Sequence, residues 1–133
     1  MSPVWLNRLV SAVGVVFLGA GVFHGLALIW PNISEPMPWT THLAFVAING
    51  LMAGVFFFHP PWLPWAYGAL TLQQLWQHGG DLIAGLMEKP PRIDWQSVIA
   101  LGGVAAIWVL VIAWRRSLSA PAATTAAASA PTR

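Results

Sequence analysis

The chain contains no cysteine, and this absence removes several kinds of site from consideration. It excludes disulfide bonds, a thiolate nucleophile, iron–sulfur or zinc sites held by sulfur, and a covalently attached c-type haem. Any metal or cofactor site must therefore be built from histidine, carboxylate or amide side chains.

Charged residues are scarce as well. Lys, Arg, Asp and Glu make up 8% of the 133 residues, whereas an average soluble domain has about 25%. The six basic residues form no run that could hold a phosphate backbone, so nucleic acid is excluded as a partner.

What the chain has instead is apolar surface. Hydrophobic residues make up 57% of the sequence, and the mean hydropathy is +0.66. A soluble fold of this size could not cover so much apolar surface with so few charges. A lipid bilayer removes the problem because lipid replaces the polar exterior. We therefore expect an integral membrane protein whose first partner is the lipid bilayer.

Four apolar runs approach the roughly 20 residues that a helix needs to cross the hydrocarbon core. They cover residues 9–30, 41–58, 64–87 and 98–114, and proline-rich or polar turns separate them. The predicted fold is all-α, a bundle of about four transmembrane helices over residues 1–116. Residues 117–133 are rich in Ala, Pro, Ser and Thr and are predicted to be a disordered tail. The first run is expected to be retained rather than cleaved as a signal peptide, because it continues to Trp30.

Basic residues predict the orientation of this bundle. Four arginines fall on one side and two basic residues on the other, namely Arg8, Arg115, Arg116 and Arg133 against Lys89 and Arg92. Because Lys and Arg favour the cytoplasmic side, both termini are predicted to be cytoplasmic. Small size and high Trp, Ala and Pro usage suggest the cytoplasmic membrane of a bacterium.

The third run carries an unusual concentration of polar side chains. Gln74, His78 and Asp81 are spaced by four and three residues, which places them on one stripe of a helix. An Asp at the centre of a bilayer costs about 2.5 to 3.5 kcal/mol on insertion scales. We therefore expect this polar stripe to face neighbouring helices or a water-filled cavity. The structural alternative is that it only forms hydrogen bonds between helices.

Other polar residues are expected at a similar depth. His24 lies about six residues, or roughly 9 Å, from the outer end of its run. His42 begins the next run, and Glu35 lies in the loop between them. The sequence predicts a pocket in the outer half of the bundle, built from the polar stripe and His24, with His42 and Glu35 at its mouth.

One function that such a pocket favours is binding of a metal ion, a haem or another cofactor. The candidate metal ligands are His24, His78 and Asp81, with His42 and Glu35 as further candidates. A haem or other cofactor would contact His24, Gln74 and His78 in the same pocket. No HxxxH or HExxH motif is present, so no spacing specifies a metal.

Two other functions stay open. In a membrane enzyme, His78 and Asp81 would be the candidate acid and base, acting on a lipophilic small molecule such as a quinone. In a proton-relay, transport or structural accessory subunit, the same residues would carry protons or hold helices together. A homo-oligomer or a larger membrane complex fits the last case best, because four short helices make a thin wall for a pore.

Overall fold

The computed structural model describes residues 2–33 and 37–119, and every regular element within them is a helix. The helices are α1 (Pro3–Ile29), α2 (Trp39–Phe58), α3 (Leu63–Met87) and α4 (Trp95–Ser119), with a short 3-10 turn at Pro31–Ile33. The all-α prediction is confirmed, and each long helix contains or closely matches one predicted run. Helix α4 continues to Ser119, beyond the predicted end at 114, whereas residues 120–133 of the predicted tail lie outside the described residues.

Local chemistry explains where the first two helices begin and end. The Ser2 hydroxyl accepts a hydrogen bond from the Trp5 amide at 3.4 Å, and Pro3 occupies the first turn, where its missing N–H costs nothing. Helix α2 ends because His59 adopts a left-handed conformation, with φ of 51°. The two prolines that follow His59 cannot continue a helix.

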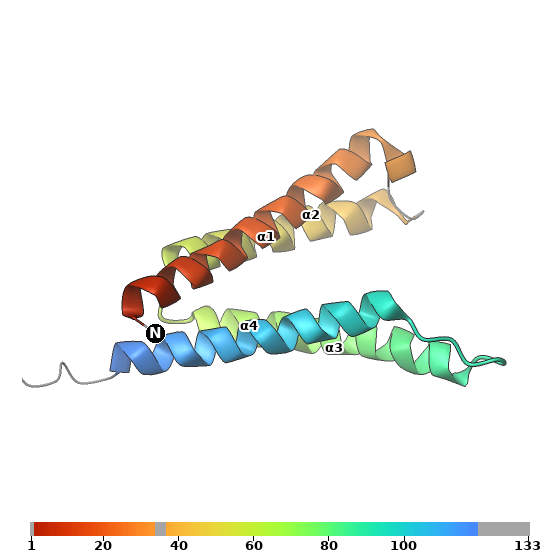
Figure 1. Ribbon diagram of the computed structural model, residues 1–133. Helices are drawn as coiled ribbons and strands as arrows, with labels where there is room; N and C mark the ends of the chain where they lie inside the picture. The colour runs from red at the N-terminus through yellow and green to blue at the C-terminus, as the bar shows by residue number, and fades with distance from the viewer. Residues whose placement is uncertain (1, 34–36, 120–133) are drawn as a thin grey trace, which may run out of the picture.

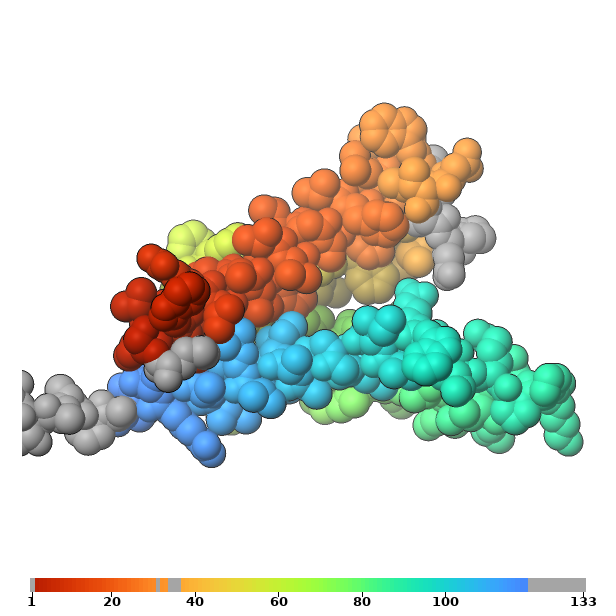
Figure 2. Space-filling model, in the orientation of Figure 1, coloured from red at the N-terminus to blue at the C-terminus, as the bar shows by residue number. Residues whose placement is uncertain are grey.

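The helices form two hairpins, α1 with α2 and α3 with α4, which meet at one end of the molecule and diverge at the other (Figure 1). The N-terminus and the end of α4 lie where the hairpins meet, which we call the closed end. The α1–α2 connection and the α3–α4 connection lie at the opposite, open end. Figure 2 shows the space-filling surfaces of α1 and α4 separating towards that end.

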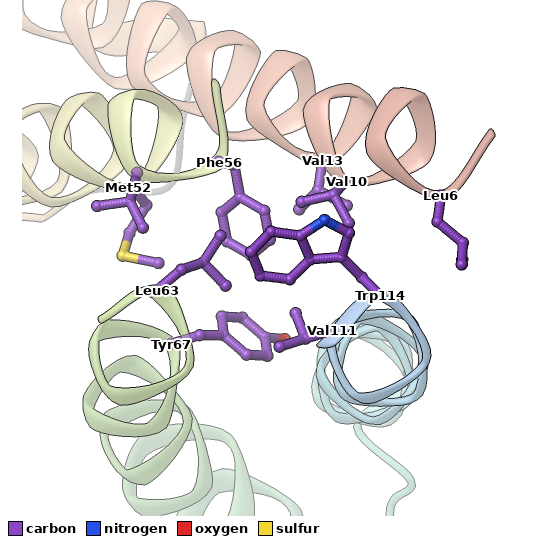
Figure 3. Close-up of a cluster of buried hydrophobic side chains, with 10 residues drawn as sticks. Leu6, Val10, Val13, Met52, Phe56, Leu63, Tyr67, Val111 and Trp114 are labelled. Atoms are coloured by element: carbon purple, nitrogen blue, oxygen red, sulfur yellow. The ribbon is translucent and has the colours of Figure 1, made fainter. Parts of the chain in front are cut away.

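The hydrophobic core lies at the closed end and draws on all four helices (Figure 3). Its buried members are Leu6, Val10, Val13, Met52, Val55, Phe56, Leu63, Tyr67, Val111 and Trp114. Trp114 is only 3% exposed, and its indole N–H donates to Asn7 Oδ1 at 2.7 Å. The core therefore fixes the relative position of the two hairpins from one end only.

Small residues bring α1 and α2 together along the first hairpin. A Cβ built on Gly14 would lie 3.1 Å from the Phe57 ring and 3.2 Å from the Ala53 carbonyl oxygen. A Cβ on Gly21 would lie 3.4 Å from Asn49 Cβ. Glycine allows this close approach of two backbones, as expected for small residues in apolar helices.

Three of the four described helices are long and apolar enough to cross a membrane, namely α1, α2 and α4. Helix α3 has 25 residues and is long enough, but its glutamines, histidine and aspartate lower its hydropathy. Large apolar side chains cover much of the exterior, with Phe58 at 86% and Trp76 at 87% exposure. Such a surface is suited to contact with lipid.

Candidate functional site

The residues predicted to form one pocket are distributed over three places in the structure. Gln74 lines a cavity between the two hairpins, whereas His78 and Asp81 line a polar pocket beside the α3–α4 turn. His24 and His42 contact each other on the first hairpin. Glu35 lies outside the described residues.

The cavity between the hairpins is mostly apolar and has a volume of about 230 Å³. All four helices contribute to its wall: Val16, Phe17, Ala20, Phe45, Ile48, Asn49, Tyr67, Leu70, Gln73, Gln74, Ile99, Ala100, Gly103, Val104 and Ile107. The cavity exists because the hairpins diverge just beyond the core, so their inner faces no longer touch. We refer to it as the central cavity.

Three amide side chains line the central cavity, together with Tyr67, whose hydroxyl donates to the Val104 carbonyl oxygen at 3.0 Å. Gln74 Nε2 donates to Gln73 Oε1, and Gln73 Nε2 donates to Gln77 Oε1, both at 2.7 Å. Asn49 Nδ2 donates to the Phe45 carbonyl oxygen at 2.8 Å. In this arrangement the side-chain oxygens of Gln74 and Asn49 receive no hydrogen bond from the described part of the chain, so they remain as acceptors.

A hydrogen-bonded chain of three side chains joins α3 to the start of α4. The Ser97 hydroxyl is buried and donates to Asp94 Oδ2 at 2.6 Å. Because its only hydrogen is used there, Ser97 Oγ accepts from His78 Nδ1, at 3.1 Å. A neutral His78 then carries its proton on Nδ1, which leaves Nε2 as a hydrogen-bond acceptor and a potential base.

Asp94 also has a structural role at the start of α4. Its Oδ1 accepts hydrogen bonds from the backbone N–H groups of Gln96 and Ser97, at 3.1 and 3.3 Å, so Asp94 caps the helix as its sequence position suggests. The hydrogen bonds from Ser97 lower the pKa of Asp94 below its usual range, which keeps the carboxylate ionised. On the neighbouring surface, hydrogen bonds from Arg92 likewise lower the pKa of Glu88 below its ordinary value.

The pocket beside the α3–α4 turn is predominantly polar and has a volume of about 450 Å³. Its wall comprises Met37, Gln77, His78, Asp81, Ala84, Arg92, Asp94, Gln96 and Ser97. The polar stripe was expected to face neighbouring helices or a water-filled cavity. Gln74 and His78 are half-buried, whereas Asp81 is exposed and lies on the wall of this polar pocket. Near Asp81, α3 faces the α3–α4 loop rather than another helix. The Arg92 backbone N–H donates to the Gly85 carbonyl oxygen, and the loop does not cover Asp81.

The two histidines of the first hairpin form a direct pair. His24 Nδ1 and His42 Nδ1 lie 3.0 Å apart, so one ring donates and the other accepts. The His24 ring also stacks on Phe45, with ring centroids 4.6 Å apart. His42 is buried and His24 is half-buried, so the pair is largely shielded by its own hairpin.

The predicted metal trio of His24, His78 and Asp81 does not form a coordination group. Within residues 2–33 and 37–119, no three His, Asp or Glu side chains lie close enough together to hold a metal ion. The trio is separated because His24 belongs to the first hairpin, whereas His78 and Asp81 belong to the second, and the two diverge at this end. A metal ion shared by these three residues stays a prediction, and the three side chains are not arranged to coordinate it.

Sequence reasoning missed several residues that the structure places at the site. Ser97 and Asp94 were not among the candidate residues, although their position after a tight turn could have placed them opposite His78. Asn49 was not a candidate either, because its place in the central cavity depends on how far the hairpins diverge.

Comparisons with protein families, curated proteins and solved structures find no match for this chain. The geometry of the three places is therefore the basis for any assignment of function. Chemically, the central cavity can hold an apolar ligand that has a hydrogen-bond donor group. The hydrogen-bonded series of side chains at His78 can accept a proton, and the His24–His42 pair can share one.

Proposed function

We propose that this chain is a multi-pass integral membrane protein with four spanning helices and both termini in the cytoplasm, in a bacterial cytoplasmic membrane. The apolar character of α1, α2 and α4 supports the proposal. Arg8, Arg115 and Arg116 lie at the closed end, and Lys89 and Arg92 lie in the turn at the open end. By the positive-inside rule, this distribution favours a cytoplasmic closed end.

Thiol labelling tests this topology cleanly, because the chain has no cysteine of its own. Cysteine introduced at Lys89 should react with a membrane-impermeant maleimide in intact cells, whereas cysteine introduced at Ser2 should react only after the cells are opened. The reverse pattern would invert the topology, and labelling of both sites in intact cells would remove the four-span arrangement.

Within that membrane, we propose that the protein binds a lipophilic small molecule in the central cavity. The observation that carries this proposal is an apolar cavity lined by all four helices, in which two amide oxygens accept no hydrogen bond from residues 2–33 and 37–119. Binding pockets for small molecules typically combine apolar walls with a few polar groups that orient the ligand.

The size and polarity of the central cavity suggest the class of ligand. A volume of about 230 Å³ accommodates a ring or headgroup rather than a whole lipid, so the remainder of the molecule would lie in the opening between the hairpins. The oxygens of Gln74 and Asn49 accept hydrogen bonds, which favours a ligand with a hydroxyl or N–H group. A hydroquinone with an apolar tail has both features.

A pair of adjacent glycines on α4 provides a matched test of the ligand site. A Cβ on Gly103 or on Gly102 would meet nothing within 4 Å, so no other residue of the chain crowds either position. Only Gly103 lines the central cavity. Gly103→Leu should therefore fill the cavity and reduce labelling by a photoactivatable hydroquinone at least tenfold, whereas Gly102→Leu should label like the unmodified protein. Equal labelling of the two variants would contradict the proposal.

The contact between His24 and His42 favours a second candidate, a metal ion held on the first hairpin. A metal would replace the shared proton and take one nitrogen from each ring, at about 2.0–2.1 Å for zinc. Elemental analysis of the purified protein for iron, copper and zinc tests this candidate. Near-stoichiometric metal that is lost in His24→Phe and retained in His59→Asn would support it, and absence of metal after supplementation during growth would remove it.

A further inference from the structure

One side of α3 is exposed although it carries polar side chains. Spacings of three and four residues place six residues on this side, which we call the α3 face: Ala69, Gln73, Gln77, Gly80, Asp81 and Ala84. All of them are exposed except Gln73, which is half-buried. Because α3 is also the least apolar of the four helices, its exposed polar face is poorly suited to contact with lipid.

Two groups on the α3 face are complementary and lie one helical turn apart. Gln77 Oε1 already accepts a hydrogen bond from Gln73, which leaves the Gln77 amide N–H groups to donate. Asp81, four residues later, presents carboxylate oxygens that accept. Among the described residues, none accepts from Gln77 Nε2 and none donates to the Asp81 carboxylate.

Gly80 lies between these two groups, and packing within the chain does not explain it. A Cβ at this position would meet nothing within 4 Å. Glycine is nevertheless one of the weakest helix formers. In apolar surroundings, a small residue on an exposed helix face allows the backbone of a second helix to approach closely. The space at Gly80 is therefore open for something outside this chain.

We propose that the α3 face is the interface between two copies of this chain, related by a two-fold axis perpendicular to the membrane. The two α3 helices run parallel, with their Gly80 residues close together near the axis. Gln77 of each copy donates to Asp81 of the other copy, so the same hydrogen bond forms twice. The inference rests on the four-span topology proposed above, because only in lipid is the exposed polar face costly.

A second copy is a better occupant than an unrelated helix because a two-fold interface is self-complementary by construction. In such an interface, if residue i contacts residue j, then j contacts i. A donor and an acceptor one turn apart on a single face meet this condition without any other sequence. The small residues Ala69, Gly80 and Ala84 then provide the close approach that short amide and carboxylate side chains need.

Disulfide cross-linking tests the interface directly, because a single-cysteine variant cannot form a disulfide within one copy, and a product of twice the chain's mass joins two copies. Gly80→Cys should form a covalent dimer in membranes treated with copper–phenanthroline, since a disulfide requires Cα atoms within about 4.4–6.8 Å. Gly19→Cys is the matched control, because Gly19 is an exposed glycine on α1 with equally open space around its Cβ position. Equal cross-linking of the two variants, or none with Gly80→Cys, would overturn the proposal.

The strength of association tests the hydrogen bonds. The double variant Gln77→Leu, Asp81→Leu should weaken dimerisation in lipid vesicles at least tenfold, measured by single-molecule photobleaching of labelled protein over a range of dilutions. These substitutions make α3 more apolar, so a loss of dimer cannot be attributed to poor insertion. Unchanged association would contradict the role of these residues.

Resistance to carbonate extraction reports insertion of the unmodified protein independently of its association. A protein that resists extraction but remains monomeric at every dilution overturns the interface and leaves the topology intact. A protein that carbonate removes from the membrane overturns the topology and, with it, the reason for covering the α3 face.

Discussion

The closed end and the open end of the molecule contain the same four helices but hold them together differently. At the closed end, buried side chains from all four helices pack into one cluster, and hydrogen bonds such as Trp114 to Asn7 connect elements far apart in sequence. At the open end, polar contacts form within each hairpin, as between His24 and His42 or between His78 and Ser97. The comparison indicates that the apolar core at the closed end joins the two hairpins, whereas the polar contacts at the open end stay within each hairpin.

The largest expected effect on stability comes from removing the Trp114 side chain from the core at the closed end. Trp114→Ala should lower the free energy of unfolding by about 3–5 kcal/mol, because it deletes a buried aromatic ring and leaves Asn7 without its donor. Trp76→Ala removes the same side chain from a position that is 87% exposed and should change stability little. Denaturant titration of both variants in detergent measures the difference, and similar losses would mean that the closed-end core is not the main source of stability.

The next test concerns the close packing of the first hairpin. Gly14→Val should destabilise the protein by about 1–3 kcal/mol, because the added side chain meets the Phe57 ring and the Ala53 carbonyl oxygen. Gly19→Val introduces the same side chain into the same helix where nothing lies within 4 Å. The two variants carry a similar helix-propensity effect, so their difference in thermal midpoint isolates the helix contact. If Gly19→Val is equally destabilising, the α1–α2 contact does not depend on Gly14.

At the open end, a smaller effect is expected from the cap of α4. Asp94→Ala should cost about 1 kcal/mol, since two backbone N–H groups and the Ser97 hydroxyl lose their acceptor. Asp94→Asn should retain most of this stability because Asn is as good a capping residue as Asp. Hydrogen exchange should show faster opening of the first turn of α4 in Asp94→Ala and no change at the closed end. A global loss of protection would show that the two ends are more tightly coupled than their contacts suggest.

The smallest effect is a pH dependence at the closed end. Burial lowers the pKa of His59 below its ordinary value of 6.5, outweighing the opposing hydrogen bond to the Phe56 backbone. A group with a lowered pKa in the folded state contributes stability that is complete above the unfolded pKa and lost as pH falls towards the folded pKa. Stability should therefore decline as the pH falls below about 6.5.

His59→Asn is the matched variant for this pH effect, because Asn does not titrate and tolerates the left-handed conformation of residue 59. Unfolding titrations from pH 8 to pH 5 should show a shallower decline for the variant than for the unmodified protein. Identical slopes would show that His59 does not contribute to the pH dependence.

The sequence predicted the helices more accurately than it predicted the site. The four apolar runs predicted the four helices. The polar residues were expected to converge because their depths in a parallel bundle agree. Depth is only one coordinate, and the angle between the hairpins places His24 and His78 in different contacts despite similar depths. The sequence contains no periodic signal for that angle.

By itself, the sequence determined the secondary structure and the apolar exterior, because helix length, hydropathy and turn residues act locally along the chain. Only the tertiary structure decided which polar residues meet. Gln74 lines the central cavity, His78 is oriented by Ser97, His24 pairs with His42, and Asp81 is left on an exposed face. These outcomes depend on where the core lies, since packing at the closed end leaves the hairpins free to diverge at the other.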